Sequence, residues 1–172
     1  MAYNRMVNQK FLCFLVSLCV CTGIKAQHTA EASGIVFQYE VQSDSLHAVL
    51  SAPTKGWVGV GFNSKNSIVG SDLLLFNIRG KKVTGTDLFV KGAGNPVKDS
   101  GNGGKNTAVI HGGTQESGYT KIQFSIPLDS NDPKDFVHVL GQKYWLILAY
   151  SVSDDFDHHS RVRKHIPFVL EK

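Results

Sequence analysis

Short runs of β-branched and aromatic residues recur along the chain, and this pattern constrains the fold more than any other feature. Each run spans about five to eight residues and is bounded by Gly, Asn, Asp or Ser. No long stretch shows the three- to four-residue spacing of an amphipathic helix. The pattern predicts strands at residues 35–42, 45–51, 56–62, 72–78, 81–89, 106–112, 119–126, 144–150 and 163–170.

Hydrophobic periodicity within the runs indicates how the strands pack. Ile122, Phe124 and Ile126 recur at every second position, as in a strand with one buried and one wet face. The runs at residues 73–76 (LLLF) and 145–149 (WLILA) are apolar on both faces, which favours central strands.

Polar turns at residues 43–44 (Ser-Asp) and 79–80 (Arg-Gly) join neighbouring runs as antiparallel hairpins. A chain of 172 residues is long enough for one compact core and short for two. We therefore expect one all-β domain, an antiparallel β-sandwich of about nine to eleven strands.

The first 26 residues have the layout of a secretory signal peptide. Arg5 and Lys10 precede an apolar run at residues 11–20, and the small residue Ala26 ends the segment. The run is about ten residues long, too short to cross a bilayer as a helix. We expect cleavage after Ala26 and a protein that is secreted or periplasmic.

The predicted cleavage divides the chain into a leader (1–26), a short N-terminal extension (27–33) and the sandwich domain (34–170). The exported part keeps 15 basic and 14 acidic residues, which predicts neither nucleic acid nor an anionic membrane as partner. All three cysteines and both methionines lie in the leader, so the domain offers no thiol, disulfide or thioether. Val20 precedes Cys21, where a lipoprotein needs a small residue, and we expect no lipid anchor.

Catalytic signatures are missing from the sequence. It contains no Gly-x-Ser-x-Gly elbow, no His-Glu-x-x-His and, outside the leader, no cysteine nucleophile. The glycine-rich stretch at residues 91–105 does not match a phosphate loop, because Asp99 stands where the first glycine is required. We expect this stretch to be an irregular surface connection, and the chain to be a binding module, not an enzyme.

The stretch at residues 151–165 (SVSDDFDHHSRVRKH) combines carboxylates with three histidines. Imidazole binds borderline metals and haem iron, so a ligand site is one interpretation and a polar loop before the last strand is the other. In an extended strand His158 and His159 would point to opposite faces, and one of them would face inward. His111 is interpreted as a core or edge residue, and His28, His47 and His138 as surface positions.

An ordered series of motifs resembles the DOMON domain family, of the cytochrome and dopamine beta-hydroxylase amino-terminal type, over residues 34–170. The series is GWVGVGFN (56–63), NSIVGSD (66–72), GGKN (103–106), GYTKIQFSIPL (118–128), ILAY (147–150) and SDDF with His159, Ser160 and a nearby Arg. The resemblance implies an extracytoplasmic, immunoglobulin-like sandwich that binds haem or sugar-like ligands.

In haem-binding members of that family, the iron lies between a methionine that follows the GW strand and a histidine near the last strand. The resemblance assigns the metal-binding histidine to His159, with His158 one position away, and places Ile68 at the methionine position. Trp57, like other aromatics of the strands, would line the cofactor pocket inside the sandwich or belong to the core. Because the exported chain has no methionine, a Met/His cytochrome is excluded.

Three outcomes stay open for the pocket. Haem b could bind through His159 with an open sixth position or with His111 or His165 as second ligand, and exchange electrons with a redox partner protein. A carbohydrate or another small ligand could occupy the same pocket without a redox centre, or the pocket could hold nothing. Besides a haem module and a ligand-recognition module, a catalytic metal site in the stretch at residues 151–165 is a further hypothesis for the function.

Overall fold

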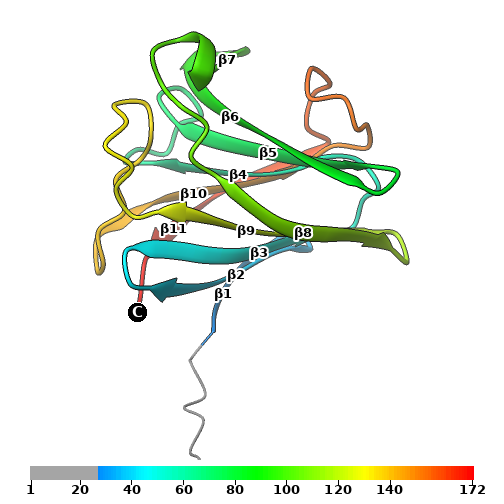
Figure 1. The fold of residues 1–172 in the computed structure, drawn as a ribbon, viewed down its shortest axis with the longest axis horizontal. Coiled ribbons are helices and arrows are strands. Elements are labelled where there is room, and N and C mark those ends of the chain that lie inside the picture. The colour runs from blue at the N-terminus through cyan, green and yellow to red at the C-terminus, as the bar shows by residue number, and fades with distance from the viewer. Residues whose placement is uncertain (1–26) are drawn as a thin grey trace, which may run out of the picture.

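The structure, a computed structural model, describes residues 27–172 as two antiparallel sheets packed face to face (Figure 1). The predicted signal peptide lies outside the described residues. The strands are β1 (His28–Ala32), β2 (Ile35–Gln42), β3 (Ser45–Ala52), β4 (Val58–Asn63), β5 (Asp72–Arg79), β6 (Lys82–Gly92), β7 (Asn95–Lys98), β8 (Val109–Glu116), β9 (Tyr119–Pro127), β10 (Lys143–Tyr150) and β11 (Val162–Val169), with a 3₁₀ turn, η1, at Asp99–Gly101.

The sheets have the orders β1-β2-β3-β9-β8 and β11-β10-β4-β5-β6-β7. All neighbouring strands are antiparallel, which confirms the predicted β-sandwich. Within residues 27–172 there is no helix with the length and hydrophobicity that a membrane crossing requires.

The inner faces of the two sheets form the main core. Alternate residues of β2, β3 and β9 are buried against alternate residues of β4, β5 and β10. The rings of Phe76 on β5 and Phe124 on β9 meet across the interface, with centroids 4.7 Å apart. This side-chain alternation is the period-two pattern that the sequence displays.

The central strands of the six-stranded sheet are also buried on their outer face. All six residues of β4 and the first seven of β5 are buried. A second hydrophobic cluster covers this outer face, made of Trp57, Leu73, Leu75, Leu88, Val90 and Ala149, with Ile68 and Phe156 packed against it. The sheet therefore needs strands that are apolar on both sides, which accounts for the LLLF and WLILA runs.

All nine predicted strands are present, with ends that differ by up to four residues. The turn expected at residues 79–80 lies one residue later, because Arg79 still pairs with Lys82 and Gly80 takes the positive φ. Two edge strands, β1 and β7, were not predicted. β7 and η1 lie inside the stretch 91–105, so the expectation of an irregular connection there was wrong, and β7 pairs with β6 along the sheet edge.

His138 is buried, which contradicts its interpretation as a surface residue. Its side chain is 4% exposed and lies edge-on against Phe62, with ring centroids 4.5 Å apart. Its Nδ1 is 3.3 Å from the hydroxyl oxygen of Tyr144. Burial lowers the pKa of His138 to about 4, because the charged imidazole would lose its hydration.

A lowered pKa in the folded state makes His138 destabilising in acid. Below pH 6.5 the His138 imidazole is protonated in the unfolded chain but stays neutral in the folded chain. The free energy of unfolding therefore falls with pH until the folded pKa of about 4 is reached. Relative to the variant His138→Phe, the wild-type protein should lose about 3 kcal/mol of unfolding free energy between pH 7 and pH 4. Urea unfolding of both proteins across this range measures the difference, and a constant difference would contradict the assignment.

Candidate functional site

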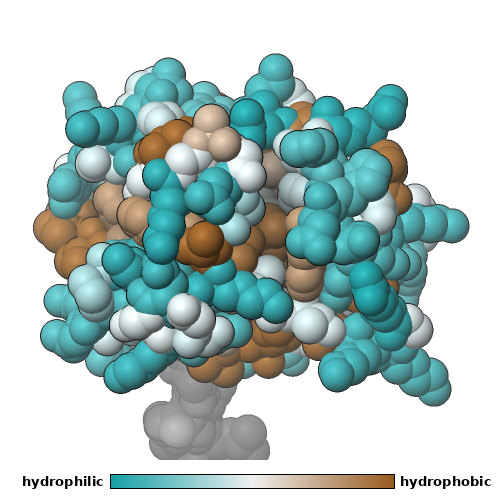
Figure 2. Space-filling view, turned by 90° about the horizontal axis from the view of Figure 1, so that it is seen from above, coloured by the Kyte–Doolittle hydropathy of each residue, from teal (hydrophilic) through white to brown (hydrophobic). Residues whose placement is uncertain are grey.

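A cavity of about 330 Å³ lies on the outer face of the six-stranded sheet, not between the sheets as the sequence suggested. It is lined by Trp57, Ile68, Leu75, Val90, Gly94, Pro96, Ala149, Phe156, Asp157, His158, His159, Ser160 and Arg163. Seen from above, on the side of β5 and β6, hydrophobic residues are visible between hydrophilic ones (Figure 2). The cavity thus combines an apolar floor with a polar rim.

Glycines of the GWVGVGFN motif shape the floor of the cavity. Val58, Val60 and Phe62 of β4 pack into the main core, so Gly59 and Gly61 lie on the outer face. A Cβ atom on Gly59 would lie 2.5 Å from the Leu75 side chain, and one on Gly61 would lie 3.0 Å from the Asp72 carbonyl oxygen. Glycine at these positions lets β5 side chains lie flat over β4.

Trp57 connects the sheet to the loop at residues 151–161, which carries both histidines. Its backbone N–H donates to the Ser153 carbonyl oxygen at 3.0 Å, and its carbonyl oxygen accepts from the Ser151 N–H at 2.9 Å. The indole Nε1 donates to the carbonyl oxygen of His158 at 3.1 Å. Trp57 is 4% exposed, so it lines the cavity wall and also supports the loop.

His158 and His159 both line the cavity. The loop is irregular until β11 begins at Val162, so the strand alternation that would have placed the two side chains on opposite faces does not apply. Nδ1 of His158 is held at 3.1 Å from the Ser151 hydroxyl and at 3.0 Å from the His159 carbonyl oxygen. Within residues 27–172, the His159 ring has no comparable hydrogen bond.

Ile68 forms the wall contributed by the loop at residues 64–71. The Asn63 amide donates to the carbonyl oxygens of Ser67, at 2.7 Å, and Val69, at 3.1 Å. The Ser71 hydroxyl donates to the Ile68 carbonyl oxygen at 2.7 Å. The loop is therefore fixed by its own polar side chains, and the half-buried Ile68 side chain presents only methyl and methylene groups to the cavity.

The other histidines do not line the cavity. His111 lies on the five-stranded sheet, where it stacks on His47 with centroids 5.8 Å apart and contacts the Ser125 hydroxyl. It lies on the wrong sheet to be a second ligand, so that expectation was wrong. His165 follows Arg163 by two residues on β11, and its Nδ1 lies 3.1 Å from the Asn66 side-chain oxygen, beside the Ile68 loop.

Sequence reasoning missed several lining residues. Arg163 was noted only as an unspecified arginine near His159, and Phe156 only as part of a motif. Gly94 and Pro96 come from the β6–β7 hairpin, which was expected to be an irregular excursion. The strand aromatics were expected either to line a pocket or to belong to the core. Trp57 lines the cavity, whereas Phe62 and Phe76 belong to the main core.

The residues present fit haem bound by one imidazole. The floor is apolar, histidines stand on one wall, and the Arg163 guanidinium could pair with a carboxylate of the porphyrin. The isoleucine wall supplies no iron ligand. The site therefore lacks a thioether ligand, and the structure provides none elsewhere in residues 27–172.

Gly56 offers a test of how tightly the histidine loop is bound to the sheet. A Cβ atom there would lie 2.7 Å from the Ser153 nitrogen and would also collide with the Ser151 carbonyl oxygen. Because these are backbone atoms, Gly56→Ala should lower the unfolding free energy by about 1 to 3 kcal/mol. Gly92→Ala is the control, since nothing lies within 4 Å of its Cβ position. Equal urea midpoints for both variants would contradict this packing.

A family model described as "DOMON domain" matches residues 31–151. The human "Putative DBH-like monooxygenase protein 2" is 26% identical over 129 residues, which cover 72% of this chain but only 25% of that protein. The chain thus spans about a quarter of the length of this relative.

Two solved structures share the fold. The cytochrome b domain of pyranose dehydrogenase from Coprinopsis cinerea aligns with a TM-score of 0.64 at 12% identity, over 84% of this chain and 81% of that one. The cytochrome domain of Myriococcum thermophilum cellobiose dehydrogenase aligns with a TM-score of 0.60 at 10% identity, over 84% and 82%.

Proposed function

The chain belongs to the DOMON domain family, and on this premise we propose that it is an exported module that binds haem through one imidazole and exchanges electrons with a redox partner protein. The observation that carries the proposal is a cavity with an apolar floor and an orientated histidine on its wall. Two proteins of the same fold are cytochrome domains, which makes haem the first ligand to test.

The contacts of the two histidines favour His158 as the iron ligand, whereas the family resemblance favours His159. A metal-binding histidine usually donates its second ring N–H to a carbonyl, carboxylate or water, which fixes the ring and leaves the other nitrogen free. Nδ1 of His158 has this arrangement with the His159 carbonyl oxygen, so its Nε2 is free to bind iron. When bound, haem would supply one-electron redox chemistry, and the protein would set its ligation and solvent access.

Single substitutions distinguish the two histidines. His158→Ala, produced by export with haem available, should lose the sharp Soret absorbance near ~410 nm, and His159→Ala should retain it. His111→Ala is the matched control, because this histidine lies on the other sheet. Loss of absorbance only in His159→Ala would overturn the choice of His158 and support the original sequence prediction, and retention in both variants would overturn ligation from this loop.

Ile68→Met tests whether the opposite wall faces the iron. A thioether there should bind the open coordination position, convert the ferric haem from high spin to low spin and raise the reduction potential. Val69→Met is the control, because Val69 is 42% exposed and does not line the cavity. Electron paramagnetic resonance and redox titration of both variants measure the change. Unchanged spin state and potential in Ile68→Met would contradict the proposed orientation of the haem.

A second candidate function is recognition of a carbohydrate or another small ligand without a redox centre. The polar rim of Asp157, Ser160 and Arg163 favours it, since such groups recognise hydroxyl and carboxylate groups. A folded wild-type protein that stays colourless when haem is available during export would favour this function.

A further inference from the structure

A second cavity, of about 370 Å³, lies beside the cavity proposed for haem, on the same outer face of the six-stranded sheet. This face is the one seen in Figure 2. Both cavities are lined by Pro96, Phe156 and Asp157, so these residues form the partition between the two spaces. The second cavity otherwise has its own lining residues, and the haem proposal makes no use of them.

Strand register makes the floor of the second cavity polar. Leu75 and Leu88 belong to the hydrophobic cluster on the outer face. Thr86 of β6 lies opposite Leu75, and Thr84 lies opposite Asn77. The outer face of the sheet therefore changes from apolar to polar along β5 and β6, and the second cavity lies over this transition.

The acidic wall of the second cavity belongs to the histidine loop. Asn77 and Arg79 of β5 fix this loop to the sheet, because their side chains both donate to the Asp154 carbonyl oxygen, at 2.6 Å and 3.0 Å. The Asp157 N–H donates to Asp155 Oδ1 at 3.1 Å. These contacts hold two carboxylates on the β5 side of the cavity.

The basic wall lies on the other side of β6. Lys98 on β7 pairs with Leu88, and β7 is two strands away from β5 in the sheet. Strands two positions apart lie about 9 to 10 Å from each other. Arg79 adds a second cation at the end of β5. The four charged side chains of the second cavity are thus Arg79, Lys98, Asp155 and Asp157.

These four charged side chains do not neutralise one another. Within the part of the chain that the structure describes, the ion pair found joins His28 to Glu171, which do not line this cavity. Two cations and two anions therefore line one cavity without forming an ion pair. A ligand with a positive and a negative group could pair with both walls, because charge-assisted hydrogen bonds would form at each.

Asn77 supplies a second observation that points to a ligand. Its side chain is 3% exposed and lines the cavity. The bond from Nδ2 to the Asp154 carbonyl oxygen fixes the orientation of the amide, and Oδ1 has no hydrogen-bond partner within residues 27–172. Buried polar atoms are almost always paired. A hydrogen-bond donor is therefore missing beside Asn77, and an ammonium group carries three.

We propose that the second cavity binds an α-amino acid with an apolar side chain. The ammonium group of the ligand lies against the two aspartates and donates toward Asn77, and its carboxylate accepts from the two basic side chains. Leu88, Pro96 and Phe156 provide apolar surface for the side chain of the ligand. The inference goes beyond the proposed function, since this site requires no haem.

The charges of the cavity select this class of ligand over others. A neutral polyol would leave all four charged side chains without an ionic partner. An amine or a carboxylic acid alone would pair with one wall and place its charge near cations or anions of the same sign. A cavity of about 370 Å³ is at the small end of ligand sites, which suits a single amino acid. The competing explanation is that water alone solvates the four groups.

Calorimetric titration of the wild-type protein, purified after export, with L-leucine tests the proposal. One molecule should bind per chain, whether or not haem is present. Two analogues lack one charge each: 3-methylbutylamine has no carboxylate, and 4-methylpentanoate has no amino group. Each should bind at least about tenfold more weakly than L-leucine. Absence of saturable L-leucine binding, or equal affinities for all three, would overturn the site, and tighter binding of glucose would overturn the class of ligand.

Charge-neutral variants assign the two walls. Lys98→Gln should weaken L-leucine binding at least about tenfold and leave 3-methylbutylamine binding unchanged. Asp155→Asn should weaken L-leucine binding similarly, but not the binding of 4-methylpentanoate. Asp129→Asn is the control, because Asp129 is also exposed and its Oδ1 also accepts a backbone N–H, from Asn131 at 2.8 Å.

Folding and haem binding are separable from this result. Lys98 and Asp155 are exposed and do not line the cavity proposed for haem, so neither variant should change the melting temperature or any Soret absorbance. Unchanged L-leucine binding in both variants would overturn the site. Weaker binding of L-leucine and of both analogues alike would overturn the assignment of the two walls.

Discussion

The burial of both faces of the central strands of the six-stranded sheet is the constraint on which the rest of the structure depends. Its inner face packs on the five-stranded sheet, but among residues 27–172 no other sheet covers its outer face. Two loops, at residues 64–71 and 151–161, cover part of that face instead. Loops cover a sheet less completely than a layer of strands does, and the cavity is the space that they leave above β4 and β5.

Trp57 and the neighbouring glycines explain the position of the loop at residues 151–161. Trp57 packs on the outer face and binds the 151–161 loop through its backbone and its indole N–H. Gly56 and Gly59 allow backbone and side chains to approach where any larger residue would collide. The valines and the phenylalanine of the GWVGVGFN motif thus pack into the main core, while its glycines allow close packing on the outer face. The position of both histidines depends on this motif.

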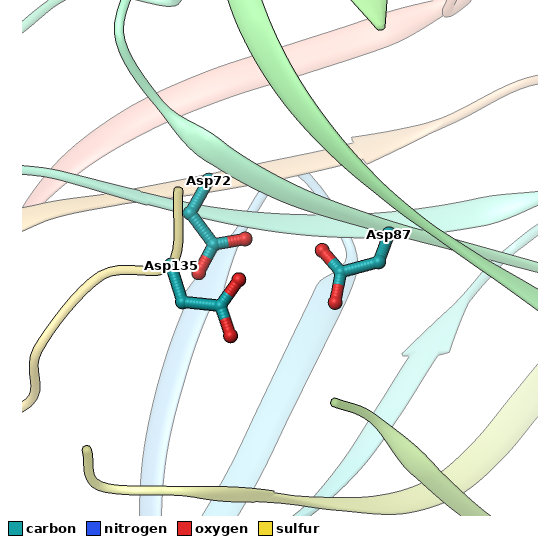
Figure 3. A group of neighbouring side chains, drawn as sticks. All are labelled: Asp72, Asp87 and Asp135. Atoms are coloured by element: carbon teal, nitrogen blue, oxygen red, sulfur yellow. The ribbon is translucent and has the colours of Figure 1, made fainter. Parts of the chain in front are cut away.

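The sequence predicts most of the fold, because strand periodicity records burial directly. It does not reveal β7, whose four residues NPVK lie at an edge and show no alternation. His138 was expected at the surface because a histidine is usually more exposed than the valines beside it. Here the reverse holds: Val137 and Val139 are 48% and 50% exposed, and the histidine between them is buried. The sequence did not predict that the carboxylates of Asp72, Asp87 and Asp135 lie close together (Figure 3), because these residues are far apart in sequence and meet only through the pairing of β5 with β6 and through the loop before β10.

The account of function rests on the cavity being a haem site, and the most direct measurement is iron quantitation with an absorption spectrum of the wild-type protein purified after export with haem available. The account predicts about one iron per chain and a Soret band that shifts on reduction, with the spectrum of high-spin ferric haem, because only an imidazole is supplied. A folded protein with no iron and no Soret band would contradict it.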